Sequence, residues 1–291
     1  MGKTYISYCQ KHYQKHYNEY YASKLGKKTS DRAKTSAIRH AQLNAIKDTF
    51  EDALKKYYPD VSPADLWDTL YSNYVAEKSK ITKSSTLSTQ IVRDVISADQ
   101  SWRKSSGHAF EAFIAERANK KLKKANVTFI LQKDLTKLIK KGLIKNEEDE
   151  LNWIKHLIKT GVFDLYAIGE IGEDKYVFGC IQCKTSIRDR VKSDREPSMD
   201  AMKNGFWSIA VTLDGAFLTM PKFQEMVNGK KDGKKVDKKN GWHAMYVMSN
   251  SDNCGRIQSV DLSLSDLTSD AQRAYQDWVR LPKRLSHDWT A

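Results

Sequence analysis

The sequence predicts an α/β protein of the α+β type, with a helical N-terminal region at residues 1–104 and a mixed-sheet core at residues 105–291. In the first hundred residues, apolar side chains recur three and four positions apart, which is typical of amphipathic helices. From Val162 onward, short apolar runs alternate with turn residues, which is typical of strands. With 40% hydrophobic and 29% charged residues, the composition is that of an ordinary globular protein.

The N-terminal region contains two well-marked helices and one ambiguous segment. Apolar positions from 38 to 57 predict one amphipathic helix, and Pro59 ends it. Ser62 and Pro63 then suit the N-cap and the first position of the next helix. The segment from Tyr5 to Tyr21 is rich in Tyr, His and Lys. It is either a helix that docks on a partner subunit or a frayed amphipathic terminus.

The core is predicted to hold a mixed sheet of short strands joined by hairpins. We expect helices at 106–124, 132–141, 151–158 and 264–279, a short helix after Pro197, and strands at 162–168, 176–184, 206–213, 216–220 and 242–248. The lysine-rich stretch at 228–240 is predicted to be a loop, which either clamps phosphates or is simply solvated.

The charge of the chain indicates a polyanionic partner. There are 49 Lys and Arg residues against 36 Asp and Glu, a formal net charge of +13. Such an excess favours binding to nucleic acid such as double-stranded DNA. No apolar run approaches the ~20 residues of a membrane-spanning helix. The N-terminus lacks the apolar segment of a signal peptide, so we expect a cytoplasmic protein with no membrane partner.

The four cysteines do not form a recognisable redox or zinc motif. Cys180 and Cys183 match C-x-x-C but lie inside a strand-like run, where this spacing directs the two thiols to opposite faces. A structural zinc site would need a second ligand pair at suitable spacing. We therefore expect reduced, buried cysteines.

The segment from Phe163 to Glu196 carries the residues that point to chemistry. Asp164 lies near the start of the first strand of a predicted hairpin, and Lys184 ends the second. A turn at residues 171–174 brings both to one end of the sheet. Phosphodiester hydrolysis needs carboxylates that hold a metal such as Mg²⁺. A lysine can orient the attacking water and offset negative charge on phosphorus. Alternatively, Asp164 only caps a turn.

Asp164 followed by Gln182-Cys183-Lys184 resembles the PD-(D/E)XK nuclease pattern. The sequence departs from it in two places: Phe163 precedes the aspartate, and Gln182 stands where an acid is usual. The resemblance is to the Type II restriction endonucleases that cut CCGG-containing sites, and it is closest to BsaWI-type enzymes, whose site is CCGG flanked by A or T. It implies a PD-(D/E)XK core. Motifs match over residues 111–196, and the rest resembles the family only in general architecture.

In this subgroup the missing acid lies about a dozen residues beyond the lysine, which implies Glu196 as the second metal ligand. Asp194 is its main rival because it is acidic and close by. An acid on an upstream helix often joins the site, which implies Glu111. The alternative interpretations are an N-cap-like role for Glu196 and a solvated helix position for Glu111.

The same subgroup carries an R-(D/E)-R element shortly after the lysine, matched here by Arg188-Asp189-Arg190. Arginine donates two hydrogen bonds to guanine, and an aspartate accepts one from cytosine N4. A two-fold homodimer would then read a palindrome of two cytosines and two guanines. The alternative is a solvated turn with local ion pairs.

The resemblance therefore implies a restriction endonuclease that uses Mg²⁺ on double-stranded DNA. Asp164, Glu196 and Glu111 would bind the metal, and Lys184 would position the water. Two rival functions remain at this point: a structure-selective DNA nuclease, and a basic DNA-binding regulator without catalysis.

Overall fold

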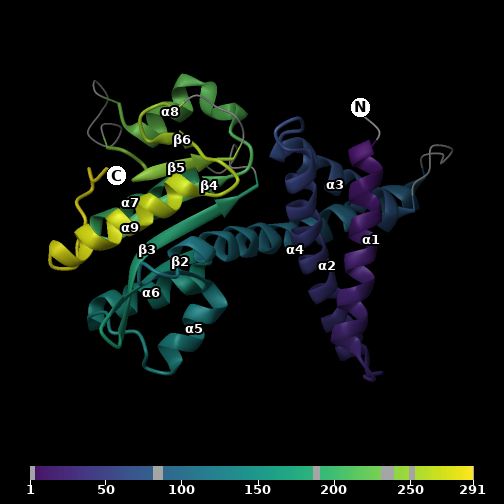
Figure 1. Cartoon of the computed structure of the whole chain (residues 1–291), viewed down its shortest axis with the longest axis horizontal. Helices are drawn as coiled ribbons and strands as arrows, with labels where there is room; N and C mark the ends of the chain where they lie inside the picture. The colour runs from purple at the N-terminus through teal and green to yellow at the C-terminus, as the bar shows by residue number, and fades with distance from the viewer. Residues whose placement is uncertain (1–3, 81–87, 186–190, 231–238, 249–252, 291) are drawn as a thin grey trace. The chain divides into compact units, whose positions relative to one another are not determined.

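The computed structural model describes residues 4–80, 88–185, 191–230, 239–248 and 253–290 (Figure 1). The chain divides into two compact units, Met1–Phe113 and Ile114–Ala291. Helix α4 (Thr89–Leu122) contains both this boundary and the one predicted at 104/105. None of the described helices combines the length and the apolarity that crossing a membrane requires.

The first unit is built from helices. They are α1 (Thr4–Leu25), α2 (Asp31–Tyr57), α3 (Pro63–Ser79) and the N-terminal part of α4. Ser62 caps α3 as predicted, because its side chain accepts a hydrogen bond from the Asp65 N–H at 3.1 Å. Ser30 caps α2 in the same way, so that helix begins earlier than its apolar stripe alone indicated.

Aromatic side chains form the core of this unit. Trp67 makes edge contacts with Phe50 and Phe110, with ring centroids 4.7 and 5.9 Å apart. The ambiguous segment Tyr5–Tyr21 is part of α1, which buries Cys9 and packs against α2 and α3. Its interpretation as a frayed terminus is therefore wrong.

The second unit contains, among its described residues, a six-stranded sheet in the order β1-β2-β3-β4-β5-β6. The strands are β1 (Val127–Leu131), β2 (Leu165–Ile171), β3 (Asp174–Lys184), β4 (Trp207–Thr212), β5 (Ala244–Val247) and β6 (Ile257–Ser259). The first three pair antiparallel, whereas β3 to β6 pair parallel. The mixed sheet is confirmed. The expectation of hairpins throughout is wrong, because a parallel pair needs a crossover, here α7 (Val191–Lys203) between β3 and β4.

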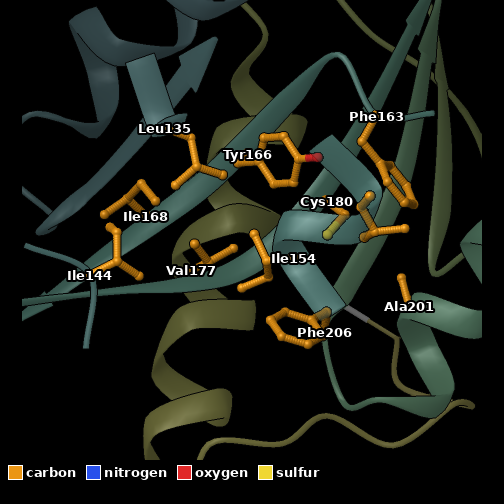
Figure 2. Close-up of a cluster of buried hydrophobic side chains, with 11 residues drawn as sticks. Leu135, Ile144, Ile154, Phe163, Tyr166, Ile168, Val177, Cys180, Ala201 and Phe206 are labelled. Carbon is orange, nitrogen blue, oxygen red and sulfur yellow. The ribbon is translucent and has the colours of Figure 1, made fainter. Parts of the chain in front are cut away.

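Both faces of the β2–β3 hairpin are covered. On one face a buried cluster joins Phe163, Tyr166 and Cys180 to side chains of α5 (Gln132–Lys140) and α6 (Glu148–Thr160) (Figure 2). Helix α9 (Ser265–Arg280) packs its Tyr275 against the hairpin so closely that a Cβ on Gly169 would lie 2.1 Å from the ring. Cys180 and Cys183 are buried, as predicted, and neither forms a disulfide.

Several predicted elements differ from the structure. Residues 216–220 are not a strand but a 3-10 turn, η1 (Ala216–Thr219), that leads into α8 (Pro221–Asn228). Helix α7 begins before Pro197, which lies inside it. Strands β1 and β6 were not predicted. Residues 231–238 of the predicted basic loop lie outside the described residues.

Candidate active site

Asp164 is placed by the backbone on either side of it. Gly161 ends α6 in the left-handed conformation, with φ 65°, and turns the chain toward the sheet. Phe163 is fully buried. The Asp164 N–H donates to the Ile181 carbonyl at 3.0 Å. The ladder between β2 and β3 thus extends by one residue, and Asp164 lies beside the C-terminal end of β3.

Asp164 and Lys184 form a close ion pair at this end of the hairpin. Lys184 Nζ lies 2.8 Å from Asp164 Oδ2, and the Cys183 N–H donates to the same oxygen at 2.8 Å. Both side chains are largely buried, with 13% of Lys184 and 15% of Asp164 exposed. The carboxylate is therefore oriented by one backbone bond and one charge-assisted bond.

The environment keeps Lys184 charged. Burial on its own would lower the pKa of this ammonium group, but the charge and hydrogen bond of Asp164 outweigh it, and the charge of Asp194 adds to them. The net result is a pKa of Lys184 above its ordinary value. Lys184 is consequently a cation at neutral pH and suits charge neutralisation rather than proton abstraction.

Gln182, which stands where the family pattern has an acid, has both ends of its amide bonded in the interior. Its Nε2 donates to the Asp194 carbonyl at 3.0 Å, and its Oε1 accepts from Trp242 Nε1 at 2.8 Å. The side chain is completely buried. An ionised carboxylate could accept from Trp242 but could not donate to the Asp194 carbonyl. This position is therefore structural, and it ties α7 to β3.

A second anchor holds the first turns of α7. Arg195 Nε donates to the Met226 carbonyl at 2.9 Å, and its guanidinium also donates to the Lys239 carbonyl at 2.7 Å. Of the two candidate metal ligands on this helix, Asp194 is half-buried and its charge acts on Lys184. Glu196 is exposed.

The remaining candidates lie outside the part of the second unit described above. Glu111 lies on α4 in the first unit, where its carboxylate pairs with His108 Nδ1 at 3.1 Å. Arg188, Asp189 and Arg190 lie outside the described residues. Sequence reasoning did not find the link from Trp242 through Gln182 to α7, because its members are far apart along the chain.

Comparison with known proteins identifies the family to which the chain belongs. The family described as "BsaWI restriction endonuclease type 2" matches residues 136–279, a span that includes Asp164, Lys184 and α7. The crystal structure of a pre-specific BsaWI–DNA complex is 39% identical in sequence, with 99% of this chain and 98% of that chain covered and a TM-score of 0.66. The chain belongs to the Type II restriction endonuclease family.

Two further likenesses involve another member of this family of site-specific deoxyribonucleases. The Type II restriction enzyme AgeI of Thalassovita gelatinovora is 30% identical over 173 residues, which is 54% of this chain and half the length of AgeI. The structure of a specific AgeI–DNA complex matches 91% of each chain at 19% identity and a TM-score of 0.51. At that identity the likeness supports the fold alone.

The donors at the site fit a hard divalent cation. Asp164 offers carboxylate oxygens at the end of β3, and Asp194 on α7 is close enough for its charge to act on Lys184. Mg²⁺ takes oxygen ligands and keeps several waters, so two protein carboxylates are sufficient to hold it.

Proposed function

We propose that this protein makes Mg²⁺-dependent double-strand cuts in DNA at a palindromic site with a CCGG core, flanked by A or T. The observation that carries the proposal is the buried pair of Asp164 and Lys184 at the end of β3, next to the start of α7. It is supported by the likeness to BsaWI over nearly the full length of both chains.

In this proposal Asp164 and a carboxylate of α7 would hold Mg²⁺. When bound, the metal supplies positive charge that activates water and stabilises the leaving oxygen. The Cys183 N–H and Lys184 keep the Asp164 carboxylate in one orientation. Lys184 orients the attacking water and offsets the charge that develops on the phosphate.

The second ligand is proposed to come from α7, and the two candidates on this helix, Asp194 and Glu196, can be distinguished. Asp194 is favoured by its half-buried position and its electrostatic contact with Lys184. Glu196 is favoured by its spacing from the lysine in the family pattern. Asp194→Asn and Glu196→Gln should therefore be compared for the Mg²⁺ concentration at half-maximal cleavage. The variant that lacks the ligand should need at least about tenfold more Mg²⁺, by analogy with other losses around metal sites.

Glu111 is proposed as a further ligand, and Glu111→Gln tests it in the same assay. A half-maximal Mg²⁺ concentration equal to that of the unaltered enzyme would remove Glu111 from the site. Its neighbour Glu116, which is exposed on the same helix, provides the matched control as Glu116→Gln.

Recognition is proposed to reside in Arg188, Asp189 and Arg190, between Lys184 and α7. Each arginine would bond a guanine and the aspartate the paired cytosines. Because a palindrome presents the same half-site twice, a homodimer in the bacterial cytoplasm is the proposed active form.

The first experiment is incubation of the protein with plasmid DNA, with and without Mg²⁺, followed by mapping of the ends. Cuts confined to CCGG sites, and only with Mg²⁺, would support the proposal and identify the flanking bases. Random or structure-directed nicking would agree with nuclease activity but would contradict the proposed recognition of a CCGG core. Tight duplex binding without any cleavage would instead indicate a DNA-binding regulator, which the net charge of +13 also suits.

A further inference from the structure

Two histidines and an aspartate converge on the seam between α1 and α2 in the helical unit. His12 and His16 lie one turn apart on α1, and Asp52 lies on α2. One ligand-type atom from each lies within 4.8 Å of the others. His16 Nε2 is 3.0 Å and His12 Nδ1 is 3.7 Å from Asp52 Oδ2.

These separations suit a shared metal ion. Zinc–nitrogen bonds are about 2.0–2.1 Å long, so the ligand atoms of a tetrahedral centre lie about 3.4 Å apart. The distances from Asp52 Oδ2 to His16 Nε2 and to His12 Nδ1, 3.0 and 3.7 Å, lie on either side of that value. His12 Nδ1 is buried, and Asp52 Oδ2 at 3.7 Å lies beyond direct hydrogen-bond distance from it. A buried ring nitrogen of this kind needs a partner.

The surroundings hold the imidazole rings in place. The ring of Tyr8 stacks on His12, with centroids 3.8 Å apart and planes 24° apart. Glu19 Oε2 lies 3.7 Å from His16 Nδ1, which is the nitrogen that does not face Asp52. A carboxylate on the far nitrogen of a ligating histidine fixes its tautomer and raises its basicity.

We propose that His12, His16 and Asp52 bind a divalent transition-metal ion of the zinc class, which clamps α1 to α2. Two imidazoles and one carboxylate suit Zn²⁺, Co²⁺ or Ni²⁺ better than Mg²⁺, which prefers oxygen ligands. Three protein ligands leave a fourth position for water. The site shares no residue with the proposed cleavage site, so the proposal stands apart from the proposed function.

The test is titration of the full chain with ZnCl₂ by calorimetry, in an Asp164→Asn background that weakens zinc binding at the cleavage site. Single variants His12→Ala, His16→Ala and Asp52→Asn are compared with the unaltered site. Each should lose one zinc equivalent or bind it at least about tenfold more weakly. His156→Ala, which removes an exposed histidine in the second unit, is the matched control and should keep full binding.

Thermal unfolding separates a metal site from a plain hydrogen bond. Asp52→Asn keeps a side-chain oxygen that can accept from His16, so it preserves that contact while weakening the ligand set. Zinc should raise the midpoint of the helical unit in the unaltered protein and not in Asp52→Asn. The proposal would be overturned if all four variants bound zinc with the stoichiometry and affinity of the unaltered site, and if zinc shifted the midpoint of Asp52→Asn equally. The three residues would then form an ion pair only.

Discussion

The two units hold their clusters of polar side chains by different means. At the end of β3, the backbone fixes the site, because Asp164 donates to the Ile181 carbonyl and accepts from the Cys183 N–H. At the seam of α1 and α2, side chains from two helix faces meet through packing. A site built on strands depends on register, whereas a site between helices depends on their contact. Substitutions should therefore affect the two in different ways.

The largest effect should come from Lys184→Ala. In the proposed mechanism, loss of this cation removes charge stabilisation at the phosphate, so cleavage should fall by at least about 10²–10³-fold. The measurement is cleavage under saturating Mg²⁺ together with DNA affinity in Ca²⁺. Affinity should stay within a few fold, since the lysine belongs to the proposed chemistry. Lys192→Ala, at an exposed position nearby, serves as the control. Unchanged cleavage by Lys184→Ala would show that the strand-held pair is not the site.

Gln182→Glu should destabilise the same region. An ionised carboxylate there cannot donate to the Asp194 carbonyl and is buried without a cation, which costs about 3 kcal/mol of unfolding free energy. Urea unfolding measures the loss. Gln182→Met, which removes the hydrogen bonds without adding charge, should cost less. Equal stability of Gln182→Glu and the unaltered protein would contradict the structural role of the amide.

His243 should make the stability of the second unit depend on acid pH. Burial lowers the pKa of His243 to about 3, and the Ser208 N–H donates to its Nδ1 at 3.0 Å, so the folded state holds the neutral ring. Between about pH 6.5 and 3 the unfolded state binds the extra proton. Stability is therefore full above pH 6.5 and falls by about 1.4 kcal/mol per pH unit below it.

The comparison for His243 is His243→Asn, which keeps an acceptor near Nδ1 but does not titrate. Unfolding free energies measured in urea from pH 7 to 4 should fall less steeply for this variant. An identical slope in the two proteins would mean that the acid sensitivity arises elsewhere.

The smallest effect should be that of Ser62→Ala in the helical unit. The variant leaves the Asp65 N–H without its cap and should destabilise the unit by about 1 kcal/mol. Ser62→Gly should cost only a few tenths, which makes the pair a test of capping. Thermal unfolding followed by circular dichroism gives both values. Cleavage per folded molecule should not change, since the cap only supports packing.

The sequence predicted those features that depend on near neighbours. The apolar spacing was sufficient to find α2, though not its start at Asp31, and apolar spacing with the Ser62 cap was sufficient to find α3. The change of period was sufficient to find β2 and β3. Strands β1 and β6 were missed because each is short and gains its stability from a partner strand. Residues 216–220 are as apolar as a strand, and only the surrounding fold makes them a 3-10 turn.

The candidate site likewise contains some features that the sequence predicts and others that it does not. Asp164 and Lys184 could be placed together because one hairpin joins them. The structural role of the Gln182 amide could not be predicted, since its partner Trp242 lies 60 residues away along the chain. His12 and His16 have helical spacing that could have been noticed, but Asp52 becomes their neighbour only when α1 packs on α2.

The strand order of the sheet follows the order of the chain. A polypeptide that emerges from the ribosome can therefore add each strand to the one before it, without waiting for a distant partner. Asp164 and Lys184 meet once β3 has paired with β2, and α7 then docks when β4 follows. Tyr275 covers Gly169 last, because α9 is synthesised after every strand.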